Sequence, residues 1–226
     1  LSKASLSGKK VLISAGPTYE YIDPVRFIGN HSSGKMGYAL AEEALGRGAE
    51  VTLVSGPVSI TSSNEVKLIN VVSAEEMKKA IFKEFDHTDI LIMTAAVADY
   101  KPKVVANQKI KKGGEELRLE LVKTDDILRS ISAMKKNQFV VGFALETNDE
   151  ETNAKEKLVN KNLDVIITSG GTGLTGRDIT VDVLETFFDK KIDGFGELFR
   201  FLSYKKIGTS TIQSRAIAGT KKGKYI

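Results

Sequence analysis

The sequence contains no cysteine, no tryptophan and only two histidines, His31 and His87. The absence of cysteine excludes a disulfide, a thiolate nucleophile and any metal site built on thiolates. Two histidines are too few for a histidine-based metal site. A hard cation such as magnesium, held by carboxylates and phosphates, remains open because it needs only oxygen ligands.

A long apolar segment and a signal-peptide pattern are also absent, which favours a cytoplasmic protein that is not inserted in a membrane. The 226 residues suffice for one large or two small domains, and 41% hydrophobic with 27% charged residues is ordinary for a globular protein. The net charge is only +4, because 33 basic residues face 29 acidic ones. Residues 205–226 are basic but carry no aromatic platform, so we expect no nucleic-acid partner.

The dinucleotide fingerprint G-x-G-x-x-G is missing, so a conventional dinucleotide-binding fold has little support. Residues 29–35 do spell G-x-x-x-x-G-K, the skeleton of a phosphate-binding P-loop. However, Met36 stands where that motif needs serine or threonine, and no clear strand is predicted before Gly29. Residues 30–37 nevertheless bring two serines, a lysine and two glycines to the start of a predicted helix, whose free N–H groups attract anions. The sequence therefore predicts a phosphate cradle of another kind.

Strands and helices alternate along the chain. Apolar runs predict buried strands, and apolar residues at helical spacing predict helices, one of which opens with the capping-box pattern of residues 73–76. This alternation predicts an α/β fold, a three-layer, Rossmann-like, mostly parallel sheet with helices on both faces. The expected strands are residues 11–15, 51–55, 90–94, 117–121, 139–144 and 165–168, and the expected helices are 34–47, 73–85, 125–134, 149–161, 180–188 and 194–203.

The ends of these strands predict where a ligand binds, because ligands of parallel sheets lie beyond the carboxyl ends of the strands. Residues 16–18, 95–96, 142–143 and 170–173 all follow predicted strands. Residues 95–114 lack periodicity and carry five lysines, so we expect a long loop there. In a compact domain such a loop is more often a functional flap than an accident.

Six motifs, in order and with natural spacing, resemble phosphopantothenoylcysteine synthetase over about residues 8–167. In that family, the carboxylate of 4′-phosphopantothenate attacks the α-phosphate of CTP, with Mg²⁺ present, and leaves an acyl-cytidylate. The amine of L-cysteine then attacks the acyl group, which yields an intermediate of coenzyme A synthesis. The resemblance also implies a homodimer. The motifs are residues 15–18, 23–26, 30–37, 95–100, 109–112 and 142–147.

The resemblance assigns roles to individual residues. Asn30 would act on the acyl-cytidylate, where its amide could polarise the carbonyl on which charge develops. Arg26 would be an assisting cation, and Lys109, on the mobile loop, would close over the leaving pyrophosphate. The other positions that match nucleotide contacts are Gly16, Ser32, Ser33, Gly34, Met93, Thr94, Ala95, Ala96, Asp99, Val122, Lys123, Thr124, Asp125, Phe143, Lys157 and Lys161.

Beyond residue 167 the sequence resembles a second family, the molybdopterin adenylyltransferases, over about residues 163–226. In that family the Gly-Gly-Thr-Gly turn, here residues 170–173, binds the pterin phosphate or nucleotide, and the counterpart of Asp178 is catalytic or metal-linked. We therefore expect a nucleotide-binding domain, residues 1–167, and a C-terminal segment, residues 168–226, packed on the same sheet. The first half of that second family is missing, so we expect this segment to be chemically silent.

Several interpretations stay open. The chain is a CTP-dependent ligase, a molybdopterin-binding or adenylylating protein, or a chimera that binds a nucleotide without turnover. The identity of the nucleotide, CTP or ATP, is open as well. Simpler roles also exist for single residues. Asn30 could cap a helix, Asp99 could cap a turn and Phe143 could belong to the core. Lys157 and Lys161, four residues apart, could form a solvated helix face.

Overall fold

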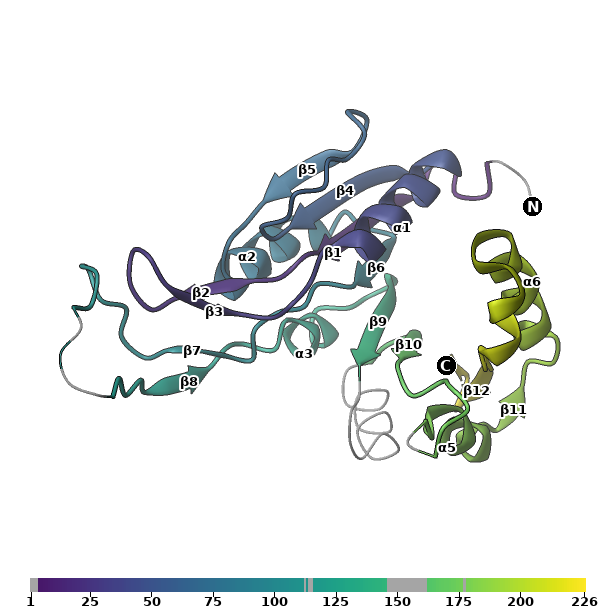
Figure 1. The fold of residues 1–226 in the computed structure, drawn as a ribbon. Coiled ribbons are helices and arrows are strands. Elements are labelled where there is room, and N and C mark those ends of the chain that lie inside the picture. The colour runs from purple at the N-terminus through teal and green to yellow at the C-terminus, as the bar shows by residue number, and fades with distance from the viewer. Residues whose placement is uncertain (1–3, 112, 114–115, 146–161, 177) are drawn as a thin grey trace. The chain divides into compact units, whose positions relative to one another are not determined.

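The computed structural model describes residues 4–111, 113, 116–145, 162–176 and 178–226, and it divides into two compact units, Leu1–Phe139 and Val140–Ile226 (Figure 1). The predicted α/β fold with a mostly parallel sheet is confirmed. None of the helices described in these ranges is long and apolar enough to cross a lipid bilayer.

The first unit is built on four parallel strands in the order β6–β1–β4–β5. Its central strand, β1, is buried from Val11 to Ala15, as expected for a parallel strand that is covered on both faces. Because the strands run in one direction, their carboxyl ends lie at one edge of the sheet. The strands are β1 (Lys10–Ala15), β4 (Glu50–Ser55), β5 (Lys67–Asn70) and β6 (Ile90–Met93).

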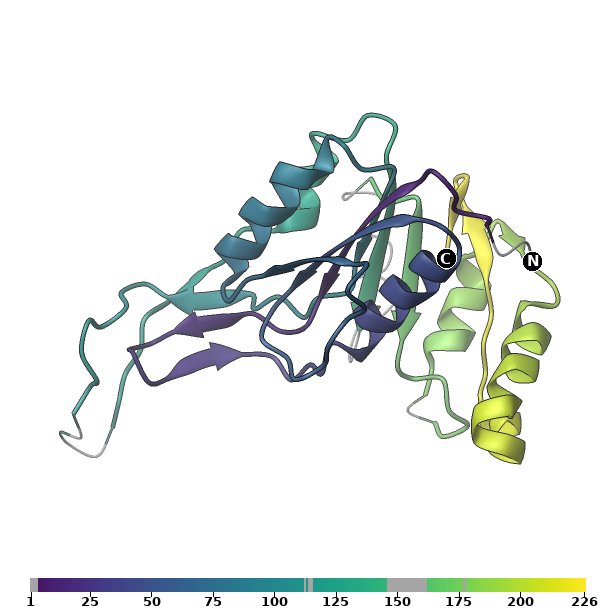
Figure 2. The ribbon, with the colours of Figure 1, turned by 90° about the horizontal axis from the view of Figure 1, so that it is seen from above.

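Two helices cover opposite faces of this sheet (Figure 2). Val11 and Ile13 of β1 form one buried cluster with Tyr38 and Ala41 of the first helix, α1. Side chains alternate along a strand, so Leu12 points to the other face, which the second helix, α2, covers. The predicted capping box of α2 is confirmed, since its N-cap serine accepts a hydrogen bond from the N–H of the glutamate three residues on. The helices of this unit are α1 (Lys35–Gly46), α2 (Ala74–Phe85) and α3 (Ile127–Ser132).

Two antiparallel strand pairs lie beyond the main sheet. The pair β2 (Tyr19–Tyr21) and β3 (Phe27–Gly29) was not predicted, because three-residue strands give too little alternation to detect. The pair β7 (Tyr100–Pro102) and β8 (Leu121–Lys123) joins the two ends of the lysine-rich loop, and β7 lies against β2. The expected loop at residues 95–114 therefore contains one short strand.

The strand predicted at residues 117–121 is wrong in position, because the observed strand is β8. Pro102 pairs with Leu121 at the end of the ladder, and proline has no N–H to continue it. The helix expected at residues 125–134 is shorter than predicted and begins after its N-cap, Asp126, whose side chain accepts a hydrogen bond from the N–H of Arg129 at 3.0 Å.

The second unit has its own strand order, β9–β10–β13–β12–β11, in which β9, β10 and β13 are parallel and the last two pairings are antiparallel. The boundary expected after residue 167 falls within β10. The helices expected at 180–188 and 194–203 are confirmed as α5 and α6, whereas the helix expected at 149–161 lies outside the described residues. The elements are β9 (Phe139–Leu145), β10 (Val165–Ser169), α5 (Thr180–Phe187), β11 (Lys190–Lys191), α6 (Phe195–Ile207), the 3₁₀ helix η1 (Gly208–Gln213), β12 (Gly219–Lys221) and β13 (Lys224–Tyr225).

Candidate functional site

Two glycine backbones meet at the carboxyl edge of the first unit's sheet. Gly16 follows β1 and Gly34 precedes α1, with φ angles of 74° and 73°. A Cβ atom on Gly16 would lie 2.9 Å from Cγ1 of Val58. A Cβ atom on Gly34 would lie 3.0 Å from the same Cγ1 atom and 3.5 Å from the backbone nitrogen of Gly16. Both positions therefore require glycine, since the left-handed conformation strains other residues and little space is left for a side chain. Bare backbone at a helix N-terminus is the geometry that lets an anion approach.

The start of α1 is pressed against the ends of two strands. A Cβ on Gly37 would lie 2.5 Å from Cβ of Ala15 and 2.7 Å from Oγ1 of Thr94. The N-cap of α1 is Gly34, with no side chain capping the helix, and its first turn contains no acidic residue. The first N–H groups and the positive end of this helix are therefore not satisfied by a carboxylate of the first turn.

Two details of the predicted cradle need correction. Ser32 and Ser33 lie ahead of α1 rather than in its first turn, and the hydroxyl of Ser32 accepts a hydrogen bond from the N–H of Gly34 at 3.3 Å. A short strand, β3, does reach Gly29, contrary to prediction. That strand belongs to an antiparallel hairpin and not to the parallel sheet, so the conclusion that this is not a P-loop stands.

Asn30 is tied to the loop that follows β6. Its Nδ2 donates to the carbonyl oxygen of Val97 at 3.0 Å, across 67 positions of sequence. The idea that Asn30 caps α1 is wrong, because Gly34 occupies the N-cap. Its side chain instead bridges the cradle and residues 94–99, and its second amide hydrogen has no partner among the described residues. That geometry suits an amide that must also reach a bound ligand.

The loop after β6 is held by three hydroxyls, whose structural role the sequence did not indicate. The hydroxyl of Thr94 donates to the carbonyl of Ser14 at 2.6 Å, and the buried hydroxyl of Ser14 accepts from the N–H of Ala95 at 3.2 Å. The N–H of Ala98 donates to the buried hydroxyl of Thr18 at 2.9 Å. Small hydroxyl residues inside an otherwise apolar strand end are the signal that could have identified this role. Asp99 is exposed, and its carboxylate has no partner among the described residues. The idea that Asp99 caps a turn is therefore wrong.

Residues 124 and 125 extend the site toward α2. The hydroxyl of Thr124 donates to the carbonyl of Ala98 at 2.6 Å, and its N–H donates to the carbonyl of Asp99 at 2.9 Å. Asp125 pairs with Lys78 at 2.6 Å, an ion pair that lowers the pKa of the Asp125 carboxyl. Nothing in the sequence indicates that Lys78 of α2 belongs here. Val122 and Lys123, which precede these residues, lie in β8.

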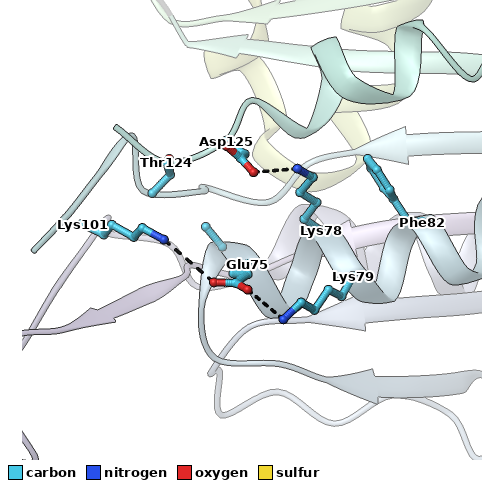
Figure 3. Close-up of a pocket in the computed structure, with 8 residues that line it drawn as sticks. Glu75, Lys78, Lys79, Phe82, Lys101, Thr124 and Asp125 are labelled. Carbon is cyan, nitrogen blue, oxygen red and sulfur yellow. Dashed lines mark hydrogen bonds and ion pairs between the residues drawn. The ribbon is translucent and has the colours of Figure 1, made fainter. Parts of the chain in front are cut away.

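A cavity of about 330 Å³ opens beside these residues (Figure 3). Lys79 and Lys101 approach Glu75 from two sides, at 2.7 and 3.9 Å, and the Lys79 pair lowers the pKa of the Glu75 carboxyl. The lysines of this cavity are therefore engaged with carboxylates, so it is not a ready-made phosphate site. The lining residues are Ala74, Glu75, Lys78, Lys79, Phe82, Lys101, Thr124 and Asp125.

A buried carboxylate anchors the lysine-rich loop. Asp23 is fully buried and accepts five hydrogen bonds, from the N–H groups of Val25, Arg26 and Ile110 and twice from the Arg26 guanidinium. The Arg26 side chain holds the pKa of the Asp23 carboxyl well below its usual range, with help from the backbone donors. Arg26 is thus an ion-pair partner here. Lys109, next to Ile110, is exposed and its ammonium has no partner among the described residues.

Each predicted site residue lies in the first unit, in the second unit or outside the described residues. The N–H of Ala96 donates to the carbonyl of Gly16 at 2.9 Å. Within the first unit, this bond and the contacts above join Gly16, Asn30, Ser32, Gly34, Thr94, Ala95, Ala96 and Thr124, and Met93 ends β6 beside them. Phe143 lies in β9 of the second unit, where it pairs with Ile167. Lys157 and Lys161 lie outside the described residues, so their assignments stay predictions.

The side chain of Asp178, in the second unit, stabilises the turn in which it lies. Its carboxylate accepts hydrogen bonds from the N–H and hydroxyl of Thr175 and lies against Gly173, where a Cβ would come within 2.7 Å of it. Arg215 pairs with Asp182 and donates to the Asp178 carbonyl. The carboxylate is therefore engaged in fixing the local backbone.

The comparisons with known proteins agree with this fold. The family described as "DNA/pantothenate metabolism flavoprotein C-terminal domain" matches residues 6–186, so the chain belongs to that family. The match runs past residue 167, where the first resemblance was expected to end.

Two curated relatives and one solved structure show the extent of the similarity. A "Cysteine/Cysteine sulfinic acid decarboxylase" of an unknown prokaryotic organism is 53% identical over 169 residues, which is 74% of this chain and 47% of that protein. "Coenzyme A biosynthesis bifunctional protein CoaBC" of Vibrio cholerae is 52% identical over 180 residues, 76% of this chain and 45% of that protein. The chain thus spans about half the length of these relatives. A crystal structure of the C-terminal domain of a CoaBC protein is 40% identical, with a TM-score of 0.66, covering 81% of this chain and 95% of that one.

Proposed function

We propose that this chain is a phosphopantothenate–cysteine ligase of coenzyme A biosynthesis that uses CTP and Mg²⁺ and acts through an acyl-cytidylate. The observation that carries the proposal is the pairing of a bare phosphate cradle, Gly16 with Gly34, and an amide, Asn30, that bridges this cradle to the neighbouring loop. The naming of the CoaBC relatives supports the pathway.

The first half-reaction needs the triphosphate to be bound and its charge neutralised. The N-terminus of α1 offers N–H groups to phosphate oxygens, and the bare backbone at Gly16 and Gly34 lets a phosphate come close. Lys109 supplies a cation that stabilises the departing pyrophosphate as the carboxylate of 4′-phosphopantothenate displaces it. Mg²⁺ neutralises phosphate charge when bound. It would be held mainly by the triphosphate, since no cluster of three or more histidine, aspartate or glutamate side chains occurs in the described part of the chain.

The second half-reaction transfers the acyl group to the amine of L-cysteine and releases CMP. Asn30 stabilises the oxygen on which negative charge develops, because its second amide hydrogen is available for that oxygen. Residues 94–99 and 122–125 would contact the nucleoside and its phosphates. The nucleotide contacts that the family resemblance implies for Phe143, Lys157 and Lys161 stay predictions. In this proposal Arg26 acts from its ion pair with Asp23, near the substrate.

We also propose that the protein acts as a homodimer in the cytoplasm. Large apolar side chains remain exposed on the two antiparallel strand pairs, which is typical of a surface that another chain covers. These side chains are Tyr21, Phe27, Tyr100 and Leu121. The reaction consumes CTP and thiol-bearing cysteine, both cytoplasmic metabolites, which supports that location.

Calorimetric titration of the full chain with CTP and with ATP tests the nucleotide, and product analysis with 4′-phosphopantothenate and L-cysteine tests the reaction. We expect CTP to bind more tightly than ATP and pyrophosphate and phosphopantothenoylcysteine to form in equal amounts. Binding of CTP without either product would favour the alternative of a nucleotide-binding chimera. No binding of either nucleotide at millimolar concentration would refute the assignment.

A further inference from the structure

The carboxylate of Asp23 joins two segments that are far apart in the sequence. It sits in the turn between β2 and β3, and its partner Ile110 lies 87 residues on, in the lysine-rich loop. The backbone of this turn is closed by the N–H of Ile22, which donates to the carbonyl of Arg26 at 2.8 Å. The loop is fastened at a second point, because the N–H of Ala106 donates to the carbonyl of Ile22 at 2.9 Å. Residues 106–110 are therefore docked on the turn.

The two oxygens of Asp23 have different tasks. Oδ1 accepts the N–H groups of Val25 and Arg26, both at 2.9 Å, and so shapes the turn itself. Oδ2 accepts from Nε of Arg26 at 2.9 Å and from the N–H of Ile110 at 3.1 Å. Nη2 of Arg26 in turn donates to the carbonyl of Ile110 at 2.8 Å. Ile110 is thus held by both its backbone groups, one through the carboxylate and one through the guanidinium.

We propose that Asp23 is a positioning residue that places Lys109 over the triphosphate by fixing the backbone of Ile110, an inference that rests on the proposed function. Lys109 is exposed and has no anchoring contact of its own among the described residues, so the position of its ammonium depends on the backbone next to it. A lysine side chain loses much conformational entropy when it binds, and a fixed backbone reduces what remains to be lost. A buried, charged acceptor makes this anchor stronger than a neutral one.

Asp23→Asn separates the two tasks. The new amide keeps an oxygen for the N–H groups of Val25 and Arg26, but its NH₂ group faces the donors of Ile110 and Arg26 and cannot accept from them. Glu20→Gln is the matched control. Glu20 is a buried carboxylate on the same hairpin, and it accepts a hydrogen bond from the N–H of Ala74, which a glutamine oxygen also accepts. In the described structure, Glu20 makes no hydrogen bond to residues 106–110.

Hydrogen exchange tests the anchor without any nucleotide. In the unmodified protein, the amide of Ile110 should exchange more slowly than those of Lys109 and Lys111, which donate no hydrogen bond within the described residues. Because this comparison needs no variant, it tests whether the backbone of Ile110 is anchored even if Asp23→Asn does not fold. In Asp23→Asn the protection of Ile110 should be lost, and in Glu20→Gln it should remain. An Ile110 amide as exposed to exchange as its neighbours would overturn the proposal.

A double-mutant cycle tests whether the anchor acts through Lys109. We expect Asp23→Asn to weaken CTP binding about tenfold, as the loss of hydrogen bonds to a charged group would, and Glu20→Gln to leave it unchanged. On the Lys109→Gln background, Asp23→Asn should add less than about twofold, because residues that act as one unit are not additive. Full additivity would overturn the positioning role. If the unmodified protein fails to bind CTP, the proposed function fails, and the exchange result alone decides whether Asp23 anchors this loop.

Discussion

Nδ2 of Asn30 donates a hydrogen bond to the carbonyl of Val97 at 3.0 Å. This bond joins the segment before α1 to the loop after β6, and so it brings the phosphate cradle and residues 94–99 into one site. The second hydrogen of this amide has no partner in the described part of the chain, so it can reach a ligand. A residue that only capped a helix would not make such a bridge, which is why Asn30 is the first position to test.

Replacing Asn30 with aspartate should stop amide formation more than it weakens nucleotide binding. Aspartate keeps the size of the side chain but loses the donor, and the donor acts on charge that develops in the transition state. We expect a loss of about 3 kcal/mol in transition-state stabilisation, roughly a hundredfold in rate. Steady-state kinetics would measure the loss in the rate of amide formation, and calorimetry would measure the smaller loss in affinity for CTP. Unchanged turnover would remove Asn30 from the mechanism.

The cradle glycines give a second prediction. Gly16→Ala should destabilise the fold by about 1–2 kcal/mol, because alanine at a φ of 74° is strained and its Cβ would press on Val58. It should also weaken CTP binding. Gly46→Ala is the control, since Gly46 ends α1 with nothing within 4 Å of a new Cβ, and alanine favours the helix by up to about 1 kcal/mol. Thermal unfolding compares the stability of the two variants. Equal changes in stability would contradict the requirement for glycine at position 16.

Acid stability gives a third prediction. The pKa of Asp23 is lower in the folded protein than its ordinary value of 3.8, so the unfolded chain binds more protons near that pH. The stabilisation from Asp23 is complete above its unfolded pKa and decreases as the pH falls toward the folded pKa. Between pH 5 and pH 2, the melting temperature of the unmodified protein should therefore decrease more than that of Asp23→Asn. An equal decrease of the melting temperature in the two proteins would contradict the proposal that the charge of Asp23 stabilises the fold.

The C-terminal segment gives a fourth prediction. Asp178 fixes its own turn through Thr175, so Asp178→Asn should lower the stability of the second unit without creating or removing a pterin activity. We expect no adenylylation of molybdopterin by the unmodified protein with ATP and Mg²⁺. Adenylylation that disappears in Asp178→Asn would show a second active site and make the chain bifunctional.

The main sheet was predictable because its strands are long, apolar and separated by helical periodicity, as β1 and α2 show. The short strand pairs were not, since three residues carry no clear period. The glycines of the cradle were visible in the sequence. The roles of Asp23 and Lys78 were not, because their partners, Ile110 and Asp125, lie far along the chain and are brought close only by folding.

The most direct measurement of the central claim is the yield of phosphopantothenoylcysteine and pyrophosphate from the purified chain supplied with 4′-phosphopantothenate, L-cysteine, CTP and Mg²⁺. The account predicts that the two products form in equal amounts, and that Asn30→Asp still releases pyrophosphate but forms phosphopantothenoylcysteine roughly a hundredfold more slowly. A chain that binds CTP yet forms neither product, or a variant that forms both at the original rate, would contradict it.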